Sequence, residues 1–285
     1  MFDFSSSLSE FYHLNLFAVV FLGLVLGSFA SALVYRVPRG ISWIVKSTSA
    51  EGAPSLSDNR DSAQLRSACP ECNAPLGIFD LFPVFSWVFL RGRCRHCKAD
   101  ISAVYPICEL LTLLASLGGF AVMGFTPISL LLIFMMPFLV ALVLIDFEHF
   151  ILPNQLVLIF GVGGLVYVSM LCAANPDHWL SILTSHTIGF LLFGCFAWGL
   201  HFLGPKFLKK DALGFGDVKL FFAVGLWCGY DVFGVYIMLS GVLGALFASI
   251  WLKIKGDEVF PFGPALIASF YVVFLLDYLG LITGF

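Results

Sequence analysis

Long apolar runs separated by short polar turns dominate the hydrophobic pattern of this chain. An α-helix needs about 20 predominantly apolar residues to cross a bilayer. Eight segments approach or exceed that length, and the sixth is short. They cover residues 14–36, 102–124, 127–146, 153–174, 180–203, 217–230, 232–252 and 263–283. The pattern therefore predicts an all-α polytopic membrane protein with about eight transmembrane helices.

The composition supports this fold class. Of the 285 residues, 60% are hydrophobic and 12% are charged, and the mean hydropathy is +0.97. A soluble domain could not bury so much apolar surface. The net charge of -3 shows no basic excess, so nothing indicates a nucleic-acid partner. The first 13 residues contain no Lys or Arg, unlike a secretory signal, and we expect the first apolar run to remain as a helix.

The distribution of basic residues predicts the orientation in the membrane. Eight spans place residues 37–101, 147–152, 204–216 and 253–262 on one side. All fifteen Lys and Arg residues lie in these loops or at the span ends that face them. Because basic residues concentrate on the cytoplasmic side of membrane proteins, we expect these loops in the cytoplasm and both termini in the periplasm.

The long polar loop divides the chain into three parts. They are a first transmembrane helix (1–36), a cytoplasmic domain (37–101) and a seven-helix membrane domain (102–285). Within the loop, residues 46–66 are rich in Ser, Ala, Asp and Arg and predict a flexible linker. Residues 78–90 are apolar but short and interrupted by proline, so we expect them at the membrane interface or against the bundle.

Two CxxC pairs in the cytoplasmic loop indicate a metal site. Cys69 and Cys72 form one pair, and Cys94 and Cys97 form the other. Four thiolates at this spacing suit tetrahedral Zn²⁺, which would fold a loop too small for a large core. Disulfides are the alternative, but they are rare in the cytoplasm. We therefore predict a structural zinc site.

Two aspartates lie where apolar runs meet polar turns. Asp146 ends the third predicted span, and Asp217 begins the sixth within the sequence Gly214-Phe215-Gly216-Asp217. A carboxylate at this depth is costly in lipid, so it suggests a functional site. Two neighbouring carboxylates share one proton, which suits them to activate water for peptide hydrolysis. Gly214 and Gly216 would let the backbone approach a substrate closely.

Each aspartate also has a purely structural explanation. Asp217 could cap its helix or pair with Lys219 or Lys210, and Asp146 could lie at a solvated helix end. For either residue alone we favour the structural explanation. The two aspartates together, with the surrounding motifs, favour a catalytic pair.

Other polar residues within the spans have a range of explanations. Glu109 is costly in lipid unless it is paired or hydrated, so we expect it to face the bundle. His186 and His201 are expected to be hydrogen-bonded residues of the bundle. A transporter could use Asp146, Asp217, Glu109 and Lys219 as a proton relay, but it predicts midplane charges and an internal repeat. No convincing repeat occurs. A non-catalytic assembly factor whose zinc loop binds partners is a third possibility.

Six separated motifs are distributed over most of the chain. They are Gly27-Ser28-Phe29 with Tyr35-Arg36-Val37-Pro38; the CxxC pairs with Ser86 and Gly92-Arg93-Cys94; Tyr105-Pro106 with Glu109; Asp146 with Leu152-Pro153; Gly214-Phe215-Gly216-Asp217 with Lys219; and Pro261-Phe262-Gly263-Pro264. In this order they resemble the motifs of the bacterial type IV prepilin peptidases, which also process type II secretion pseudopilins. The order of the motifs makes the resemblance specific.

The resemblance implies an aspartic endopeptidase in which Asp146 and Asp217 are catalytic and Lys219 supports the catalytic loop. Its substrates would be prepilins or pseudopilins with a short basic leader, cut after a glycine on the cytoplasmic side of the inner membrane. Peptide cleavage would need no metal. Members with the cysteine domain usually also N-methylate the new N-terminus with S-adenosylmethionine, and Glu109 and Gly92 are candidates for that activity. A peptidase without methyltransferase activity is the alternative.

The chain departs from the family pattern at three positions. Ser31 and Ala32 replace a common Asn-Val pair, and Asn154 follows Leu152-Pro153 where Asp is common.

Overall fold

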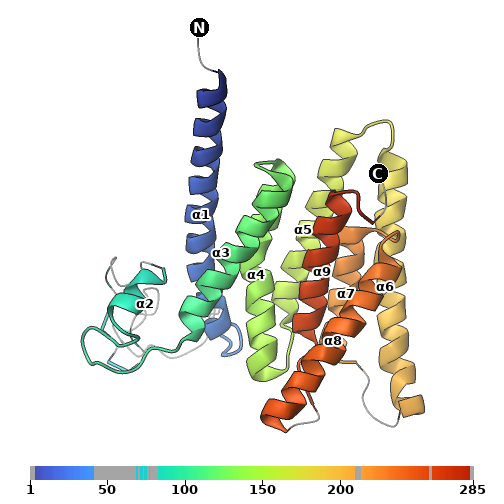
Figure 1. Ribbon diagram of the computed structural model, residues 1–285. Helices are drawn as coiled ribbons and strands as arrows, with labels where there is room; N and C mark the ends of the chain where they lie inside the picture. Colours follow the sequence, from blue (N-terminus) through green and yellow to red (C-terminus); the bar gives the residue numbers. More distant parts are fainter. Residues whose placement is uncertain are drawn as a thin grey trace, which may run out of the picture.

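A computed structural model describes residues 4–41, 69, 71–72, 74–75, 77, 83–208, 213–256 and 259–282. Within these residues the regular secondary structure is helical (Figure 1). The helices are α1 (Phe4–Arg36), α2 (Phe85–Phe89), α3 (Val104–Met123), α4 (Pro127–His149), α5 (Asn154–Ala174), α6 (Trp179–Leu208), α7 (Phe215–Cys228), α8 (Phe233–Lys255) and α9 (Gly263–Tyr278). The predicted linker 46–66 lies outside the described residues.

The eight helices other than α2 occupy the eight predicted spans. Six of them are long and apolar enough to cross a membrane, which makes this a multi-pass membrane protein. The other two, α7 and α9, have 14 and 16 residues, so the described helices do not fully confirm a count of eight spans. More than half of the residues of each short helix are buried, because both pack inside the bundle.

Successive helices run up and down, so their ends gather at the two ends of the bundle (Figure 1). One end is formed by the last turns of α1, α4, α6 and α8 and by the first turns of α3, α5, α7 and α9. We call this the basic end, because the described Lys and Arg residues lie there or in the loops that extend from it. Asp146 and Asp217 also lie at the basic end, as the even number of helices between them, α5 and α6, predicts.

Glycines allow the closest helix contacts. A Cβ atom at Gly189 of α6 would lie 2.4 Å from the Gly225 carbonyl oxygen of α7, so only glycine fits there. The small-residue segment 240–245 of α8 contributes less: Gly244 accommodates the Phe262 ring, and Gly241 faces open space. The tightest packing therefore holds α7 rather than α8, which fixes the helix that carries Asp217.

The apolar core surrounds Trp227 of α7. Its indole is fully buried, stacks on Phe160 with ring centroids 5.5 Å apart, and donates from Nε1 to the Phe160 carbonyl at 2.9 Å. His186 and His201 each donate from Nδ1 to a backbone carbonyl, of Leu226 and Leu213 respectively, which confirms that both are hydrogen-bonded bundle residues.

Candidate active site

Asp146 lies in the last turn of α4 and is 5% exposed. The helix ends at His149 because the next residue, Phe150, adopts a left-handed conformation with φ of 55°. The Phe150 N–H donates to the Asp146 carbonyl oxygen and closes this last turn. The side chain points inward, where its Oδ2 accepts the Gly263 N–H of α9 at 2.9 Å. A solvated helix end is therefore the wrong description of Asp146.

Asp217 is the third residue of α7, after the N-cap residue Gly214. Its Oδ2 accepts the Gly214 N–H at 3.2 Å, so the carboxylate closes the start of its own helix. The proposed capping role is thus observed, and it leaves the second oxygen available. Asp217 is half-buried and lies close enough to Asp146 for the two charges to interact.

Leu152 joins the two aspartate segments. A Cβ at Gly216, beside Asp217, would lie 3.0 Å from the Leu152 Cβ. A Cβ at Gly263, which holds Asp146, would lie 3.1 Å from the Leu152 Cδ2. The leucine is buried and fits between these two glycine backbones, so it sets how closely the start of α7 approaches the start of α9.

Lys219 does not pair with either aspartate in the described structure. Its Nζ donates to Asn154 Oδ1 at the start of α5 and lies 4.4 Å above the Phe215 ring. The pairing of Asp217 with Lys219 is therefore not observed, and Lys210 lies outside the described residues. This hydrogen bond ties α7 to α5, and a role of Lys219 in supporting the catalytic loop stays a prediction.

For three residues, the sequence did not predict a role in shaping this site. Gly263, Leu152 and His201 belong to the contacts of the aspartate segments, and His201 Nδ1 lies 2.7 Å from the Leu213 carbonyl just before α7. Two of them sit in motifs that were recognised, but their partners could not be read from local spacing.

The four cysteines of the predicted metal site come together. Their Sγ atoms all lie within 4.8 Å of one another, and those of Cys69 and Cys97 are 3.8 Å apart. Tetrahedral zinc with Zn–S bonds of about 2.3 Å separates its sulfurs by about 3.8 Å. The N–H groups of Cys69 and Cys94 each donate to the carbonyl five residues later, so the two turns are alike. The donor set fits Zn²⁺.

The electrostatics of the cysteines also favour a cation. Backbone amides of Cys97 and His96 lower the pKa of the Cys94 thiol to about 6. The Ala99 amide lowers the pKa of Cys97, but desolvation and the neighbouring sulfurs outweigh it and raise that pKa to about 12. Four thiolates cannot share this space without a compensating charge, which a divalent metal would supply.

Metal content gives a direct test of this cluster. We expect purified protein to carry about one zinc per chain, and we expect Cys94→Ser to lose it, because three thiolates leave the tetrahedron incomplete. Elemental analysis by mass spectrometry measures the content. Cys195→Ser, which changes an exposed cysteine of α6, is the matched control and should retain zinc. Full zinc content in Cys94→Ser would contradict the assignment.

The sequence of this chain matches two protein-family models and several known proteins. Residues 21–123 match the model of the bacterial peptidase A24 N-terminal domain, and residues 133–249 match the model of the type IV leader peptidase family. The prepilin leader peptidase/N-methyltransferase of Aeromonas salmonicida is 33% identical over 91% of this chain and 90% of its own. The chain belongs to the type IV leader peptidase family.

Two further relatives carry the same name. The Burkholderia pseudomallei protein is 33% identical over 89% of this chain and 82% of its own length. The Neisseria gonorrhoeae protein is 32% identical over 89% and 87%. No solved structure gives a significant match. The peptidase family match covers both aspartates and ends before Gly263, whose contact with Asp146 is seen in the structure.

Glu109 and Gly92, the methyltransferase candidates, both contact α2. Glu109 is buried and its Oε2 accepts the Val84 N–H at 2.6 Å, so the carboxylate pairs with the N-cap residue of α2, whereas we expected it to face the bundle. A Cβ at Gly92 would lie 2.9 Å from the Trp87 indole. These contacts favour structural roles in holding α2, and a part in methyl transfer stays a prediction. In Figure 1, α2 lies beside α1, far from α7 and its aspartate.

Proposed function

We propose that this protein is a membrane aspartic endopeptidase that removes the leader of type IV prepilins or type II secretion pseudopilins. The observation that carries the proposal is the convergence of Asp146 and Asp217. They come from the end of α4 and the start of α7, and each accepts a hydrogen bond from a glycine amide. The names of the relatives, which include prepilin leader peptidase, support the substrate class.

The mechanism assigns the two carboxyl groups complementary roles. One carboxylate takes a proton from a water molecule, and the resulting hydroxide attacks the carbonyl carbon of the scissile peptide. The other carboxyl group, which holds the shared proton, donates it to the carbonyl oxygen. Collapse of the tetrahedral intermediate breaks the C–N bond, and a proton passes to the leaving nitrogen. The backbone donors Gly263 and Gly214 orient the carboxylates throughout.

The substrate would approach from the basic end, which we propose faces the cytoplasm of the bacterial inner membrane, with both termini periplasmic. A basic leader would stay at the anionic cytoplasmic surface, and the apolar segment after the cut would enter the bilayer. This arrangement would place the scissile bond at the depth of Asp146 and Asp217. Aspartates at one end of the bundle favour this reading over a proton relay, which needs charges near the midplane.

We also propose N-methylation of the new N-terminus, because the relatives are named as N-methyltransferases. S-adenosylmethionine would supply the methyl group. The cysteine cluster is proposed to hold a structural zinc that orders the loop before α3. Glu109 and Gly92 remain the candidate residues for the methyl transfer.

A prepilin cleavage assay tests both activities. Purified protein is incubated with a prepilin peptide, with and without S-adenosylmethionine, and mass spectrometry follows leader loss and a methyl gain. We expect leader loss under both conditions and the methyl gain only with the donor. Cleavage without any methyl gain would support a peptidase alone. Absence of cleavage on several prepilin and pseudopilin peptides would contradict the proposed function.

A further inference from the structure

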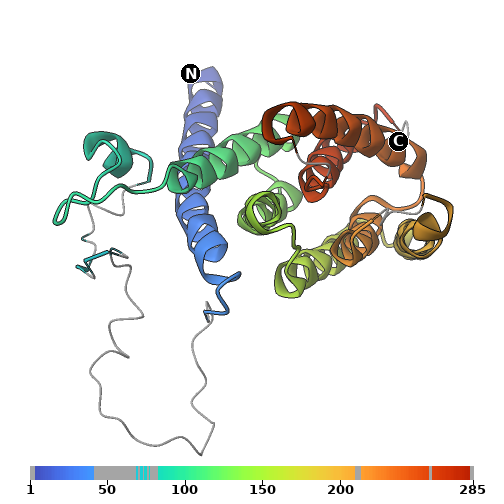
Figure 2. The same ribbon diagram turned by 90° about the horizontal axis from the view of Figure 1, so that it is seen from below.

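The segment from α2 to the second cysteine turn presents apolar side chains at its surface. Phe85, Val88 and Phe89 are 53%, 59% and 83% exposed. Both views place α2 beside α1 and α3 rather than beneath the bundle, level with their lower turns (Figures 1 and 2). Because α1 and α3 are long enough to span the membrane, a segment that lies beside their ends is at the level of the lipid headgroups.

Basic side chains lie directly after this apolar face. Arg91, Arg93 and Lys98 line a hollow of about 410 Å³, together with Leu90 and Cys94. All three cations are exposed, and Arg93 Nε lies 3.5 Å from Asp100 Oδ1. The three cations that line the hollow outnumber the one carboxylate, Asp100, among residues 83–101. The charge of the segment is therefore complementary to an anion.

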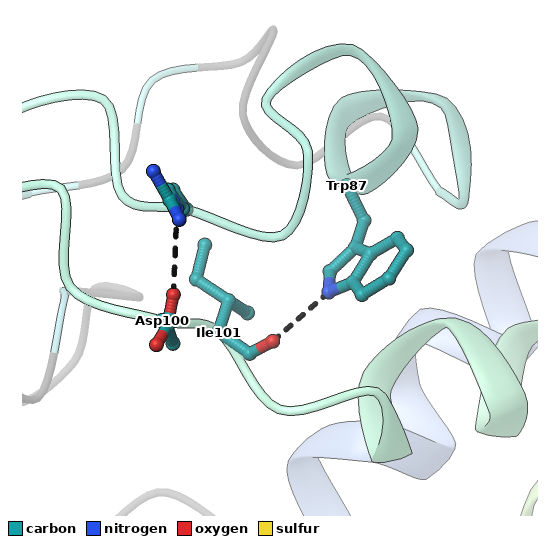
Figure 3. A network of polar contacts seen from close by, with 4 residues as sticks. Trp87, Asp100 and Ile101 are labelled. Atoms are coloured by element: carbon teal, nitrogen blue, oxygen red, sulfur yellow. Dashed lines mark hydrogen bonds and ion pairs between the residues drawn. The ribbon is translucent and has the colours of Figure 1, made fainter.

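Hydrogen bonds hold this segment in one shape. Trp87 Nε1 donates to the Ile101 carbonyl at 3.0 Å (Figure 3). The Gly92 N–H donates to the Trp87 carbonyl at 2.8 Å. The buried Glu109 carboxylate holds the Val84 N–H at the start of α2. The apolar face and the basic hollow are thus fixed relative to α3, as a preformed binding surface requires.

We propose that this surface binds an anionic phospholipid of the adjacent leaflet. The phosphate would contact Arg91, Arg93 and Lys98, while the acyl chains would lie along Phe85, Val88 and Phe89. Guanidinium and ammonium groups donate strong hydrogen bonds to phosphate oxygens. An apolar face next to such groups is typical of segments that lie in the membrane interface. The bound lipid would tether the cysteine cluster to the membrane. This inference goes beyond peptide cleavage and does not depend on it.

Native mass spectrometry of the full chain in a nonionic detergent tests the headgroup contact. Phosphatidylglycerol and phosphatidylcholine with identical acyl chains are titrated separately, and inorganic phosphate is added as a competitor. We expect phosphatidylglycerol to bind preferentially and phosphate to displace it only weakly, because phosphate lacks the acyl contacts. The Arg91→Gln/Arg93→Gln/Lys98→Gln variant should bind phosphatidylglycerol roughly 100-fold more weakly, at about fivefold per cation near an anionic surface.

The matched control removes three other cations at the basic end, as Lys206→Gln/Lys253→Gln/Lys255→Gln. It should keep the tight phosphatidylglycerol site, and an equal loss in both triple variants would overturn the proposal. Zinc content checks that the segment remains folded. If the glutamine variant loses zinc, the variant Arg91→Lys/Arg93→Lys, which keeps the charge, is used instead. Retained selectivity for phosphatidylglycerol in this variant supports the site. Lost selectivity with the zinc content unchanged refutes it.

Photo-crosslinking tests the apolar contact independently. Benzoylphenylalanine at position 89 in phosphatidylglycerol membranes should form lipid adducts, because Phe89 is the most exposed aromatic residue of α2. The same probe at position 71, an exposed site in the first cysteine turn, should form few. Equal adduct yields at the two positions, or none at position 89, would rule out the inserted orientation of α2.

Discussion

Asp146→Asn and Asp217→Asn are each expected to lower leader cleavage by roughly 10²- to 10⁴-fold, the range of a lost general acid or base. Asparagine keeps the size of aspartate and can still accept the Gly263 or Gly214 N–H, so the fold should persist. It can neither take a proton from water nor deliver one at this site. Single-turnover cleavage of a prepilin peptide, followed by mass spectrometry, measures the loss.

The double variant sharpens this test. If the two carboxyl groups act as one unit, Asp146→Asn/Asp217→Asn should be no worse than either single variant. Asp231→Asn is the matched control, because Asp231 accepts a hydrogen bond from Ser185 at the opposite end of the bundle and should keep full activity. Near-normal cleavage by either catalytic variant would refute the aspartic mechanism and revive the transporter and assembly-factor alternatives.

The sequence predicted the helices and the cysteine cluster because both depend on local patterns. Apolar runs of membrane length mark α1 and α3 to α6 to within a few residues at most ends. The two CxxC turns carry all four sulfur donors within their own spacing, and the structure brings them together. Short-range signals of this kind need no knowledge of the rest of the fold.

The ends of helices were harder to predict. The third span was expected to end at Asp146, but α4 continues through Glu148 and His149 to the left-handed Phe150. The polar residues Glu148 and His149 suggested a turn. Their side chains are exposed in the last turn of α4, so the helix can include them at little cost in solvation free energy. The extension matters because it places Asp146 inside the helix, with its side chain directed toward Gly263 rather than toward solvent.

The contacts that shape the aspartate pair could not be predicted, because they join distant parts of the chain. Gly263 and Asp146 are 117 residues apart, and Lys219 and Asn154 are 65 apart. A glycine in a membrane helix has the same appearance whether it faces open space, as Gly234 does, or the carboxylate of Asp146, as Gly263 does. Only the packing of α4 against α9 distinguishes the two.

Gly263→Ala is expected to lower cleavage by about 100-fold, through displacement of Asp146. The new Cβ would lie 2.7 Å from Asp146 Oδ2 and 3.1 Å from Leu152 Cδ2, and both contacts are too short. Neither neighbour can retreat easily, since both are buried. A shift of about 1 Å in a catalytic group is enough for a loss of this size. Overpacking should lower the free energy of unfolding by only about 1–3 kcal/mol.

The control for this variant is Gly234→Ala, whose Cβ would meet nothing within 4 Å. It should keep full activity, because alanine is at least as favourable as glycine in a helix. Steady-state cleavage separates the two effects: displacement of a carboxylate lowers kcat with little change in KM, whereas general destabilisation lowers the fraction of active enzyme and the thermal midpoint together. Unchanged kcat in folded Gly263→Ala would show that a methyl group at this position does not displace Asp146, and it would contradict the close approach of Gly263 to the carboxylate.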